Sequence, residues 1–359
     1  MLNELALTVN QWALKNVGRE WIDYFVSNTM NIGTQRLAPF FWNYDCQAQI
    51  INIRHETHDT ITLELLPNQH FAQAQAGQYI EISVTIDGQK YTRCYSLSHL
   101  HHDTVAVTIK RKEGGLVSNW LFQHARRGMC LPISHPQGRF VYQGQNKILL
   151  ISAGSGITPC YALLNQLLAE QSVVDVAMIA QFKTADDVIF ADALTALTTA
   201  EAAKKCTVHL PLTRTDAKTD VMSQLAQHPE LLERDIYLCG PAGFMDKVVA
   251  YLGSKNYDLS RLTAERFNFD ESVALGEQCL SEIYFQSHNT TVKMNEADKG
   301  KTLLEIAEAH GIELEYGCRT GMCGSCKCRL VQGEVTGNKL GVAIYPCTAY
   351  PASSKVVLG

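Results

Sequence analysis

The segment CRTGMCGSC, residues 318–326, holds three cysteines in a C-x4-C-x2-C arrangement, and a fourth cysteine follows at position 347. This spacing predicts a [2Fe-2S] cluster ligated by the thiolates of Cys318, Cys323, Cys326 and Cys347. A loop around two irons must bring backbone N–H groups close to the cluster sulfurs, and the glycines and serine between the cysteines permit that approach. A structural zinc site would favour paired C-x2-C knuckles instead.

Two alternatives remain open around this loop. Clustered cysteines can also form disulfides, but a chain of 359 residues with 12 cysteines, four of them predicted ligands, is more typical of a reducing compartment. Cys328 competes with Cys347 for the fourth ligand position. Because Cys328 falls where a strand over 327–331 is predicted to begin, we expect it to be a small buried apolar side chain.

Composition predicts a protein of two or three domains, since 359 residues with 46% hydrophobic content can fill more than one core. The net charge of -5 provides no basic stripe, so nucleic acid is not an expected partner. The N-terminus lacks the basic and apolar regions of a signal peptide, and the longest uncharged run, 148–169, is interrupted by glycines and a proline. We expect a cytoplasmic protein.

Residues 1–45 form a predicted N-terminal helical extension, because apolar residues recur at roughly helical spacing from Leu5 through Val9 and Trp12 to Trp21 and Phe25. The simpler interpretation is that this face packs on the body of the protein. The alternative is a peripheral contact of residues 5–25 with a partner or with the inner face of a membrane, since two tryptophans suit an interface.

Residues 46–143 change to a period of two, as in 47–53, 60–65, 79–84 and 105–109, with glycine and proline turns between the runs. This pattern predicts an antiparallel sheet that closes into a small barrel. The barrel segment carries RCYS at 93–96, GGLVS at 114–118 and HPQGRF at 135–140.

These three motifs, in this order, resemble the ferredoxin-NADP reductase superfamily. The resemblance implies an FAD-binding barrel in which Arg93 binds a flavin phosphate, Tyr95 stacks on the isoalloxazine ring and Ser96 hydrogen-bonds near flavin N5. A helix over 116–124 would offer its N-terminal N–H groups to the pyrophosphate. The further cofactor-binding residues implied in this region are Lys110, Gly115, Val117 and Ser118.

Residues 144–269 alternate between strand and helix patterns, which predicts an α/β domain with a parallel sheet. A strand over 147–153 runs into GSGITP at 154–159, and a strand at 235–238 ends in CGPAGFM at 239–245. Both loops resemble pyridine-nucleotide motifs of the same superfamily and would meet at the carboxyl ends of the strands. The implied nucleotide-binding residues are Gly154, Gly156, Thr158, Pro159, Cys239, Gly240 and Pro241.

Thr213 and Arg214 lie where NADP-using relatives place a hydroxyl residue and an arginine for the 2'-phosphate, so NADPH is predicted over NADH. The segment near Glu265 and Phe267 resembles the acidic and aromatic end of the reductase domain beside the flavin. Ser96, Cys239 and Glu265 are therefore the candidate catalytic residues. A linker is predicted at 270–279, followed by a ferredoxin domain of the α+β (β-grasp) class at 280–359.

The expected reaction is electron transfer from NADPH through FAD and the [2Fe-2S] cluster to a protein acceptor, because flavin converts a two-electron donor into single-electron steps. The preferred acceptor is a membrane fatty-acyl-CoA desaturase, since the N-terminal extension resembles that group. The alternative is the oxygenase component of an aromatic-ring hydroxylating system, and a redox sensor is the non-enzyme alternative. Arg319, Lys327 and Arg329 flank the ligands and are predicted to meet acceptor carboxylates.

Overall fold

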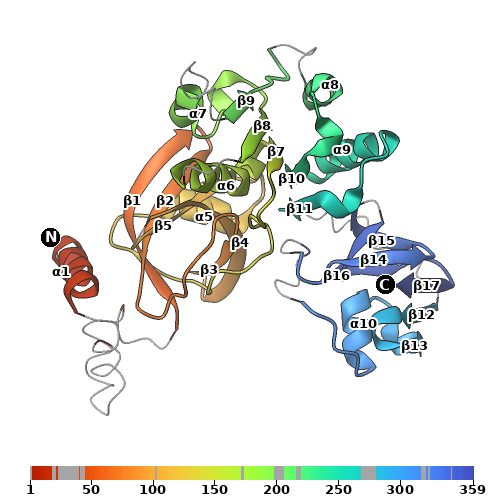
Figure 1. The fold of residues 1–359 in the computed structure, drawn as a ribbon. Coiled ribbons are helices and arrows are strands. Elements are labelled where there is room, and N and C mark those ends of the chain that lie inside the picture. The colour runs from red at the N-terminus through yellow and green to blue at the C-terminus, as the bar shows by residue number, and fades with distance from the viewer. Residues whose placement is uncertain are drawn as a thin grey trace.

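The structure is a computed structural model. It describes residues 2–17, 22, 40, 45–101, 103–170, 174–197, 206–215, 220–267, 280–316, 321, 324–340 and 342–359. Three sheets, each with its own apolar core, follow one another along the chain (Figure 1). The predicted class, an antiparallel barrel followed by a parallel α/β unit and a small α+β unit, is confirmed. The domain boundaries given above stay predictions.

The first sheet is antiparallel and has the strand order β3-β4-β5-β2-β1-β6. Bridges from Tyr79 to Gln137 and from Ile82 to Ile133 join β3 to the chain around β6, so that the sheet closes into a barrel. The alternating apolar residues fill its interior, where Ile50, Leu63 and Ile80 are fully buried. Its elements are β1 (Gln47–Thr57), β2 (Thr60–Pro67), β3 (Tyr79–Ile86), β4 (Gln89–Leu100), β5 (Val105–Lys110), helix α5 (Leu116–His124) and β6 (Cys130–Pro132).

The second sheet is parallel, with the order β11-β10-β7-β8-β9. Helices α6 and α7 contribute to the apolar core on one face, and α8 and α9 contribute to the core on the other. The near-continuous apolar sequences of β7 and β10 follow from this burial on both faces. The elements are β7 (Lys147–Ala153), α6 (Ile157–Ala169), β8 (Asp175–Gln181), α7 (Ala191–Leu197), β9 (Cys206–His209), α8 (Val221–Gln227), β10 (Asp235–Gly240), α9 (Ala242–Ser254) and β11 (Leu262–Arg266).

The third sheet has the order β13-β12-β17-β14-β16-β15, and helix α10 packs on it. Thr302 and Glu305 form a capping box that fixes the start of α10, which then buries Leu303 and Ile306. The elements are β12 (Glu282–Phe285), β13 (Thr290–Lys293), α10 (Leu303–Ala309), β14 (Cys328–Gln332), β15 (Val335–Leu340), β16 (Ala343–Pro351) and β17 (Lys355–Leu358).

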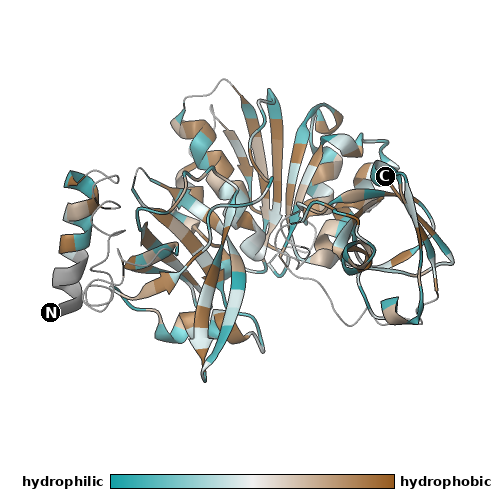
Figure 2. Ribbon diagram, turned by 90° about the horizontal axis from the view of Figure 1, so that it is seen from below, coloured by the Kyte–Doolittle hydropathy of each residue, from teal (hydrophilic) through white to brown (hydrophobic). Residues whose placement is uncertain are grey.

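The N-terminal helix α1 (Leu2–Asn16) lies beside the barrel at one end of the molecule (Figure 1, Figure 2). Asn10 is buried and donates a 3.0 Å hydrogen bond to Gln49 of β1. Val9 and Trp12, however, are 54% and 62% exposed, so the prediction that this apolar face packs on the body is wrong for these two residues. Trp21 and Phe25 lie outside the described residues. None of the described helices combines the length and apolar character needed to cross a membrane.

Candidate cofactor and electron-transfer site

Strand β4 presents the first predicted cofactor residues. Arg93 is exposed, and its Nη1 donates only to the neighbouring carbonyl of Thr92, at 2.8 Å. Burial raises the pKa of Tyr95, although the nearby Arg93 charge opposes the shift. Ser96 is buried, and its Oγ has no hydrogen-bond partner in the described chain. Because a buried hydroxyl normally has a partner, this strand fits a bound flavin that supplies one.

The N-terminus of α5 adjoins β4 and β5 and provides the second part of the flavin site. Gly115 is the N-cap residue, and a Cβ there would lie 2.7 Å from Ser118 Oγ and 2.9 Å from Lys112 Cβ, so the turn tolerates only glycine. Val117 is buried and anchors the helix on the barrel. Gly115 also lines a surface cavity of about 330 Å³, together with Ile86, Gly114, Leu116, Asn119, Trp120 and Gln123. Exposed N–H groups at a helix start suit a pyrophosphate.

Lys110, at the end of β5, is placed differently from the other predicted flavin residues. Its Nζ forms a 2.6 Å ion pair with Asp59 Oδ1. Burial would raise the pKa of Asp59, but the hydrogen bonds from Lys110, Thr57 and Thr60 lower it overall. The ammonium of Lys110 is thus already paired, and a contact between Lys110 and flavin stays a prediction.

The two predicted nucleotide loops meet at the carboxyl ends of β7 and β10. A Cβ on Gly156 would lie 2.3 Å from the backbone oxygen of Cys239, so glycine is required for this approach. Gly154 has a φ of +54°, and Pro159 occupies the first turn of α6, as the sequence predicted. Thr158 is buried and donates to Ser155 O at 3.0 Å. The arrangement leaves glycine backbone beside the strand ends, which suits a nucleotide phosphate.

Three side chains form a row across neighbouring strands at this sheet edge. Ser152 of β7 pairs in register with Cys239 of β10, and Cys239 pairs with Glu265 of β11. All three are buried, and Ser152 Oγ has no hydrogen-bond partner in the described chain. Burial raises the pKa of the Cys239 thiol, and the Glu265 and Cys160 charges add to the shift. Cys239 is therefore a neutral thiol, not a nucleophile.

Ser152 was not among the residues singled out by the sequence. A polar residue at the end of the apolar run KILLIS, directly before the glycine loop, was the available signal. The structure brings it together with two predicted catalytic residues, Cys239 and Glu265. Phe267 follows Glu265 and packs against the same core as Tyr237 and Cys239.

The predicted coenzyme-selecting residues lie after β9. Thr213 N donates to Phe182 O at 3.0 Å, and Arg214 N donates to Lys183 O at 2.9 Å. These bonds hold the segment against the carboxyl end of β8. Both Arg214 and Lys183 are exposed, so two cations lie side by side at this edge. Lys183 is a second candidate that the sequence pattern did not identify.

Two of the four predicted cluster ligands lie in the described chain. The sulfurs of Cys326 and Cys347 are 3.2 Å apart, and both cysteines are free and buried. A disulfide has an S–S length of about 2.05 Å, so these are two separate thiols that converge on one point, as a shared metal centre requires. The second alternative also resolves in this direction, because Cys328 is partly buried against the apolar core of the ferredoxin unit. Cys318 and Cys323 lie outside the described residues.

The three parts touch one another. Helix α6, which begins at the glycine loop, packs against β4, which carries the flavin motif. His99 of β4 lies edge-on to Tyr161 of α6, with ring centroids 5.2 Å apart. On the other side, Cys326 and Cys347 belong to one apolar cluster with Met245 and Val248 of α9. The chain thus provides continuous packing from the barrel through the nucleotide unit to the predicted cluster ligands.

Comparisons with known proteins agree with this division. Family models match residues 47–142 as an oxidoreductase FAD-binding domain, residues 150–250 as an oxidoreductase NAD-binding domain and residues 285–352 as a 2Fe-2S iron-sulfur cluster binding domain. FAD, a pyridine nucleotide and a [2Fe-2S] cluster are therefore the cofactors, as predicted.

Relatives and solved structures extend the match over most of the chain. A "NADPH oxidoreductase" of Mycobacterium tuberculosis is 32% identical over 324 residues, which cover 87% of this chain and 82% of that protein. One subunit of the 1,2-phenylacetyl-CoA epoxidase of Escherichia coli is 27% identical and is covered over 96% of its length, with 86% of this chain. The crystal structure of phthalate dioxygenase reductase shares the fold, with a TM-score of 0.54 and 21% identity over 87% of this chain and 97% of that one.

The preferred acceptor, a fatty-acyl desaturase, has less support from these relatives than the oxygenase alternative. Several relatives are named as reductase components of monooxygenases, including those for glycine betaine and 3-ketosteroids. The chain is an NAD(P)H-dependent, ferredoxin-type oxidoreductase, and it belongs to the ferredoxin-NADP reductase superfamily, among the flavoproteins that carry a C-terminal plant-type [2Fe-2S] domain.

Proposed function

We propose that this protein is the reductase component of an oxygenase system and carries electrons from NAD(P)H to a separate oxygenase protein. The observation that carries the proposal is the extent of the match to the phenylacetyl-CoA epoxidase component, which includes all three cofactor-binding regions and 96% of that protein. The described chain contains no cluster of three or more histidine, cysteine or acidic residues that could hold a further metal. We therefore place oxygen activation on a partner.

When bound, the flavin and the cluster together take two electrons from the nicotinamide and release them one at a time. The chain supplies position and environment. Ser96 would donate its free hydroxyl near flavin N5, and Tyr95 would cover the ring. Cys239 and Glu265 would shape the nicotinamide pocket, where the raised pKa of Cys239 keeps a neutral, water-excluding surface against the ring. No acid or base of the usual kind is required.

We propose NADPH as the preferred coenzyme, on the strength of the paired cations Lys183 and Arg214. Arg214→Ala should lower kcat/KM for NADPH about 10- to 100-fold, because a charge-assisted contact to phosphate is lost, and should leave NADH turnover unchanged. Lys90→Ala, at an exposed position of the β3–β4 hairpin, is the matched control. An unchanged coenzyme preference in Arg214→Ala would refute the assignment.

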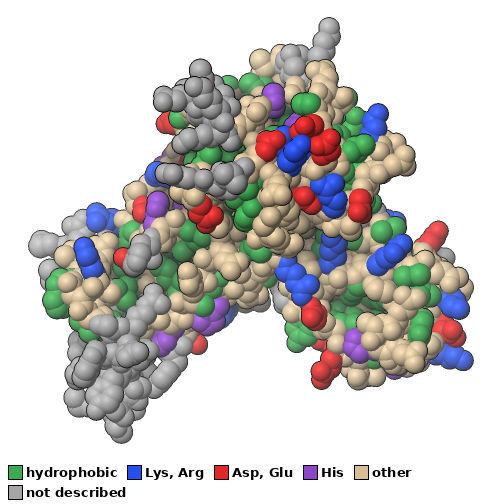
Figure 3. Space-filling view, viewed as in Figure 1, with side chains coloured by type: hydrophobic (Ala, Val, Ile, Leu, Met, Phe, Trp, Pro, Cys, Tyr) green, Lys and Arg blue, Asp and Glu red, His purple; other side chains and the backbone are tan. Residues whose placement is uncertain are grey.

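The acceptor is proposed to dock near the cluster through carboxylates. Lys327 and Arg329 are exposed, and no ion pair is found for either within the described chain, whereas Arg319 lies outside it. Figure 3 shows Lys and Arg side chains gathered where the nucleotide and ferredoxin units meet. Transfer to the acceptor should slow as ionic strength rises, and more weakly so in Arg329→Gln. A rate independent of salt would contradict this docking mode.

A desaturase remains the second candidate acceptor, favoured by the exposed Val9 and Trp12 of the N-terminal helix. The deciding experiment measures NADPH oxidation by the purified protein with washed host membranes and, separately, with the soluble fraction. Turnover with the soluble fraction that rises with an oxygenase substrate, such as an aromatic acyl-CoA, and incorporates oxygen would support our proposal. Turnover confined to membranes, stimulated by long-chain acyl-CoA and accompanied by a new double bond, would replace it with the desaturase assignment.

A further inference from the structure

One ion pair joins the flavin barrel to the ferredoxin unit. Arg139 Nη2 donates to Glu315 Oε2, across 176 positions of sequence. Arg139 belongs to the HPQGRF segment after β6, and Glu315 precedes the predicted ligand Cys318 by three residues. The contact therefore connects the barrel directly to the start of the cluster-binding loop.

The barrel holds the Arg139 backbone firmly. Gln137 exchanges backbone hydrogen bonds of 2.8 and 2.9 Å with Tyr79, and its side chain accepts a third from Tyr79 Oη at 3.0 Å. Phe140 is buried and lies edge-on to Tyr237, with ring centroids 5.2 Å apart. Arg139 is thus presented from a segment fixed on both sides, so its guanidinium loses little freedom when it pairs.

The anchor of this segment is next to the flavin strand. Tyr79, which binds Gln137, is the register partner of Ser96 on β4. Tyr79 is fully buried, and a Cβ on Gly138 would lie 3.0 Å from its ring. The strand pair that carries the proposed flavin contact at Ser96 is therefore the same one that positions Arg139.

On the ferredoxin side, the chain leading to Glu315 is anchored in the core. Ile312 is buried, and its N–H donates to Ala307 O at 2.8 Å, at the end of α10. Leu314 packs against both the ferredoxin core and the apolar cluster that contains Cys326 and Cys347. Glu315 is therefore held next to the ligand set, which is packed against α9 from one side and connected to the barrel from the other.

We propose that the Arg139–Glu315 pair is a positioning contact for internal electron transfer: it holds the cluster-binding loop near the flavin strands while single electrons pass from flavin to cluster. Arg139 and Glu315 act on distance, since neither needs to touch a cofactor. The inference rests on the proposed order of electron flow, and it is independent of which protein accepts the electrons.

The test uses Arg139→Glu, Glu315→Arg and the double charge swap in the cofactor-loaded full chain. Anaerobic mixing with NADPH in a stopped-flow instrument separates flavin reduction from the subsequent bleaching of the cluster. Each single variant should slow cluster bleaching about two- to fivefold, in line with the modest strength of exposed ion pairs, and leave flavin reduction unchanged. The double variant should recover most of the rate. Arg126→Glu, an exposed position on the same barrel, controls for the charge change itself.

A second readout does not depend on turnover. Small-angle X-ray scattering of the oxidised protein at low salt should show a larger radius of gyration in the two single variants than in the wild type and the charge swap. High salt should remove the difference by weakening the wild-type contact. Absorption spectra verify equal flavin and cluster content.

Single variants with wild-type cluster bleaching and wild-type scattering would overturn the positioning role while leaving the proposed function intact. A charge swap that fails to recover would also overturn it, because a specific pair must tolerate exchange. A wild-type cluster that stays oxidised after flavin reduction would overturn the proposed electron flow together with this inference. Failure to support an oxygenase, by contrast, affects only the proposed acceptor.

Discussion

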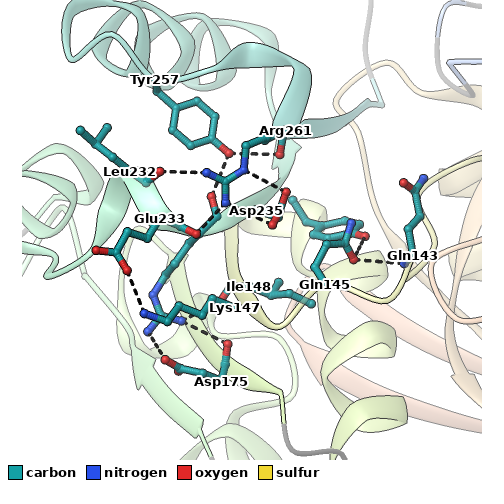
Figure 4. Close-up of polar contacts among 12 residues, drawn as sticks. Gln143, Gln145, Lys147, Ile148, Asp175, Leu232, Glu233, Asp235, Tyr257 and Arg261 are labelled. Atoms are coloured by element: carbon teal, nitrogen blue, oxygen red, sulfur yellow. Dashed lines mark hydrogen bonds and ion pairs between the residues drawn. The ribbon is translucent and has the colours of Figure 1, made fainter.

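The two ends of the parallel sheet differ in how they treat polar groups. At the amino ends of the strands, charged side chains form a closed network of hydrogen bonds and ion pairs (Figure 4). At the carboxyl ends, glycines bring backbones into contact, and Ser152 Oγ is left without a hydrogen-bond partner in the described chain. The first arrangement stabilises the unit, whereas the second keeps polar atoms available for a ligand.

The amino-end network centres on Arg234 and Arg261. Arg234 donates to the backbone oxygens of Ile148 and Asp175 at 3.2 Å and to Asp175 Oδ2 at 2.7 Å, so it joins the starts of β7 and β8. Arg261 forms two 3.2 Å bonds with the Asp235 carboxylate at the start of β10. The hydrogen bond and charge of Asp235 raise the pKa of Arg261, although burial opposes this. These contacts use up the polar capacity of that edge, which therefore has little left for a ligand.

The largest expected effect comes from filling the close approach at the carboxyl end. Gly156→Ala would place a methyl group 2.3 Å from the Cys239 carbonyl oxygen, so the glycine loop must move. We expect a loss of about 3 kcal/mol or more in the free energy of unfolding and loss of NADPH-dependent flavin reduction. Gly253→Ala, in α9, is the control: nothing lies within 4 Å of its added Cβ, and it should stabilise by about 0.5–1 kcal/mol. Equal urea midpoints for the two variants would contradict the contrast.

Removing the centre of the amino-end network should have the next largest effect, confined to stability. Arg234→Met leaves two backbone carbonyls without a donor and should cost about 2–3 kcal/mol in the free energy of unfolding. The KM for NADPH should not change, because this edge faces away from the glycine loops. Lys147→Met removes exposed pairs with Glu230 and Glu233 and should cost no more than about 0.5 kcal/mol. A raised KM in Arg234→Met would show that the two ends are coupled.

The carboxyl side should also be the more acid-sensitive, through His99. Burial, followed by the Arg54 and His101 charges, lowers the pKa of His99 from 6.5 to about 4. The unfolded chain therefore takes up a proton first as pH falls from 6.5 towards 4, which removes up to about 3 kcal/mol of stability across that window. His99→Phe should keep its stability over the same window. Parallel stability–pH curves for wild type and variant would refute this assignment.

The smallest expected change tests the row of side chains beside Cys239. Ser152→Ala should alter the free energy of unfolding by less than about 1 kcal/mol, or raise it, because the lost hydroxyl has no partner in the described protein. Flavin reduction by NADPH should nevertheless slow about two- to tenfold, since the hydroxyl is available to the nicotinamide. Ser254→Ala, which removes a 2.6 Å bond to Tyr251 O at the far end of α9, should affect stability alone. Unchanged flavin reduction in Ser152→Ala would exclude Ser152 from the site.

The sequence predicted the fold well where local pattern and burial agree. The helix over 116–124 and the strand over 147–153 have the predicted bounds, because capping, glycine loops and apolar runs act within a few residues. The cofactor motifs were identifiable for the same reason. Val9 and Trp12 were misread because helical spacing indicates an apolar face but does not indicate what covers it.

Long-range pairing was out of reach of sequence patterns. Ser152, Cys239 and Glu265 become neighbours only through strand order and register, so the partnership of Ser152 with the other two had no local signal. The Lys110–Asp59 and Arg139–Glu315 pairs join residues 51 and 176 positions apart, and many other charges could have formed them. The acceptor is unpredicted for a related reason: its recognition depends on a surface that another protein must complement.

Helix α6 limits how this protein can be recombined with its relatives. It begins at the loop for the pyridine nucleotide, and its side packs against the strand that carries RCYS, so one rigid rod serves both domains. A chimera that joins one relative's barrel to another's nucleotide unit would place unmatched surfaces at this contact. Domain exchange should therefore transfer β4 and α6 together, and natural sequence drift in either element is expected to be accompanied by change in the other.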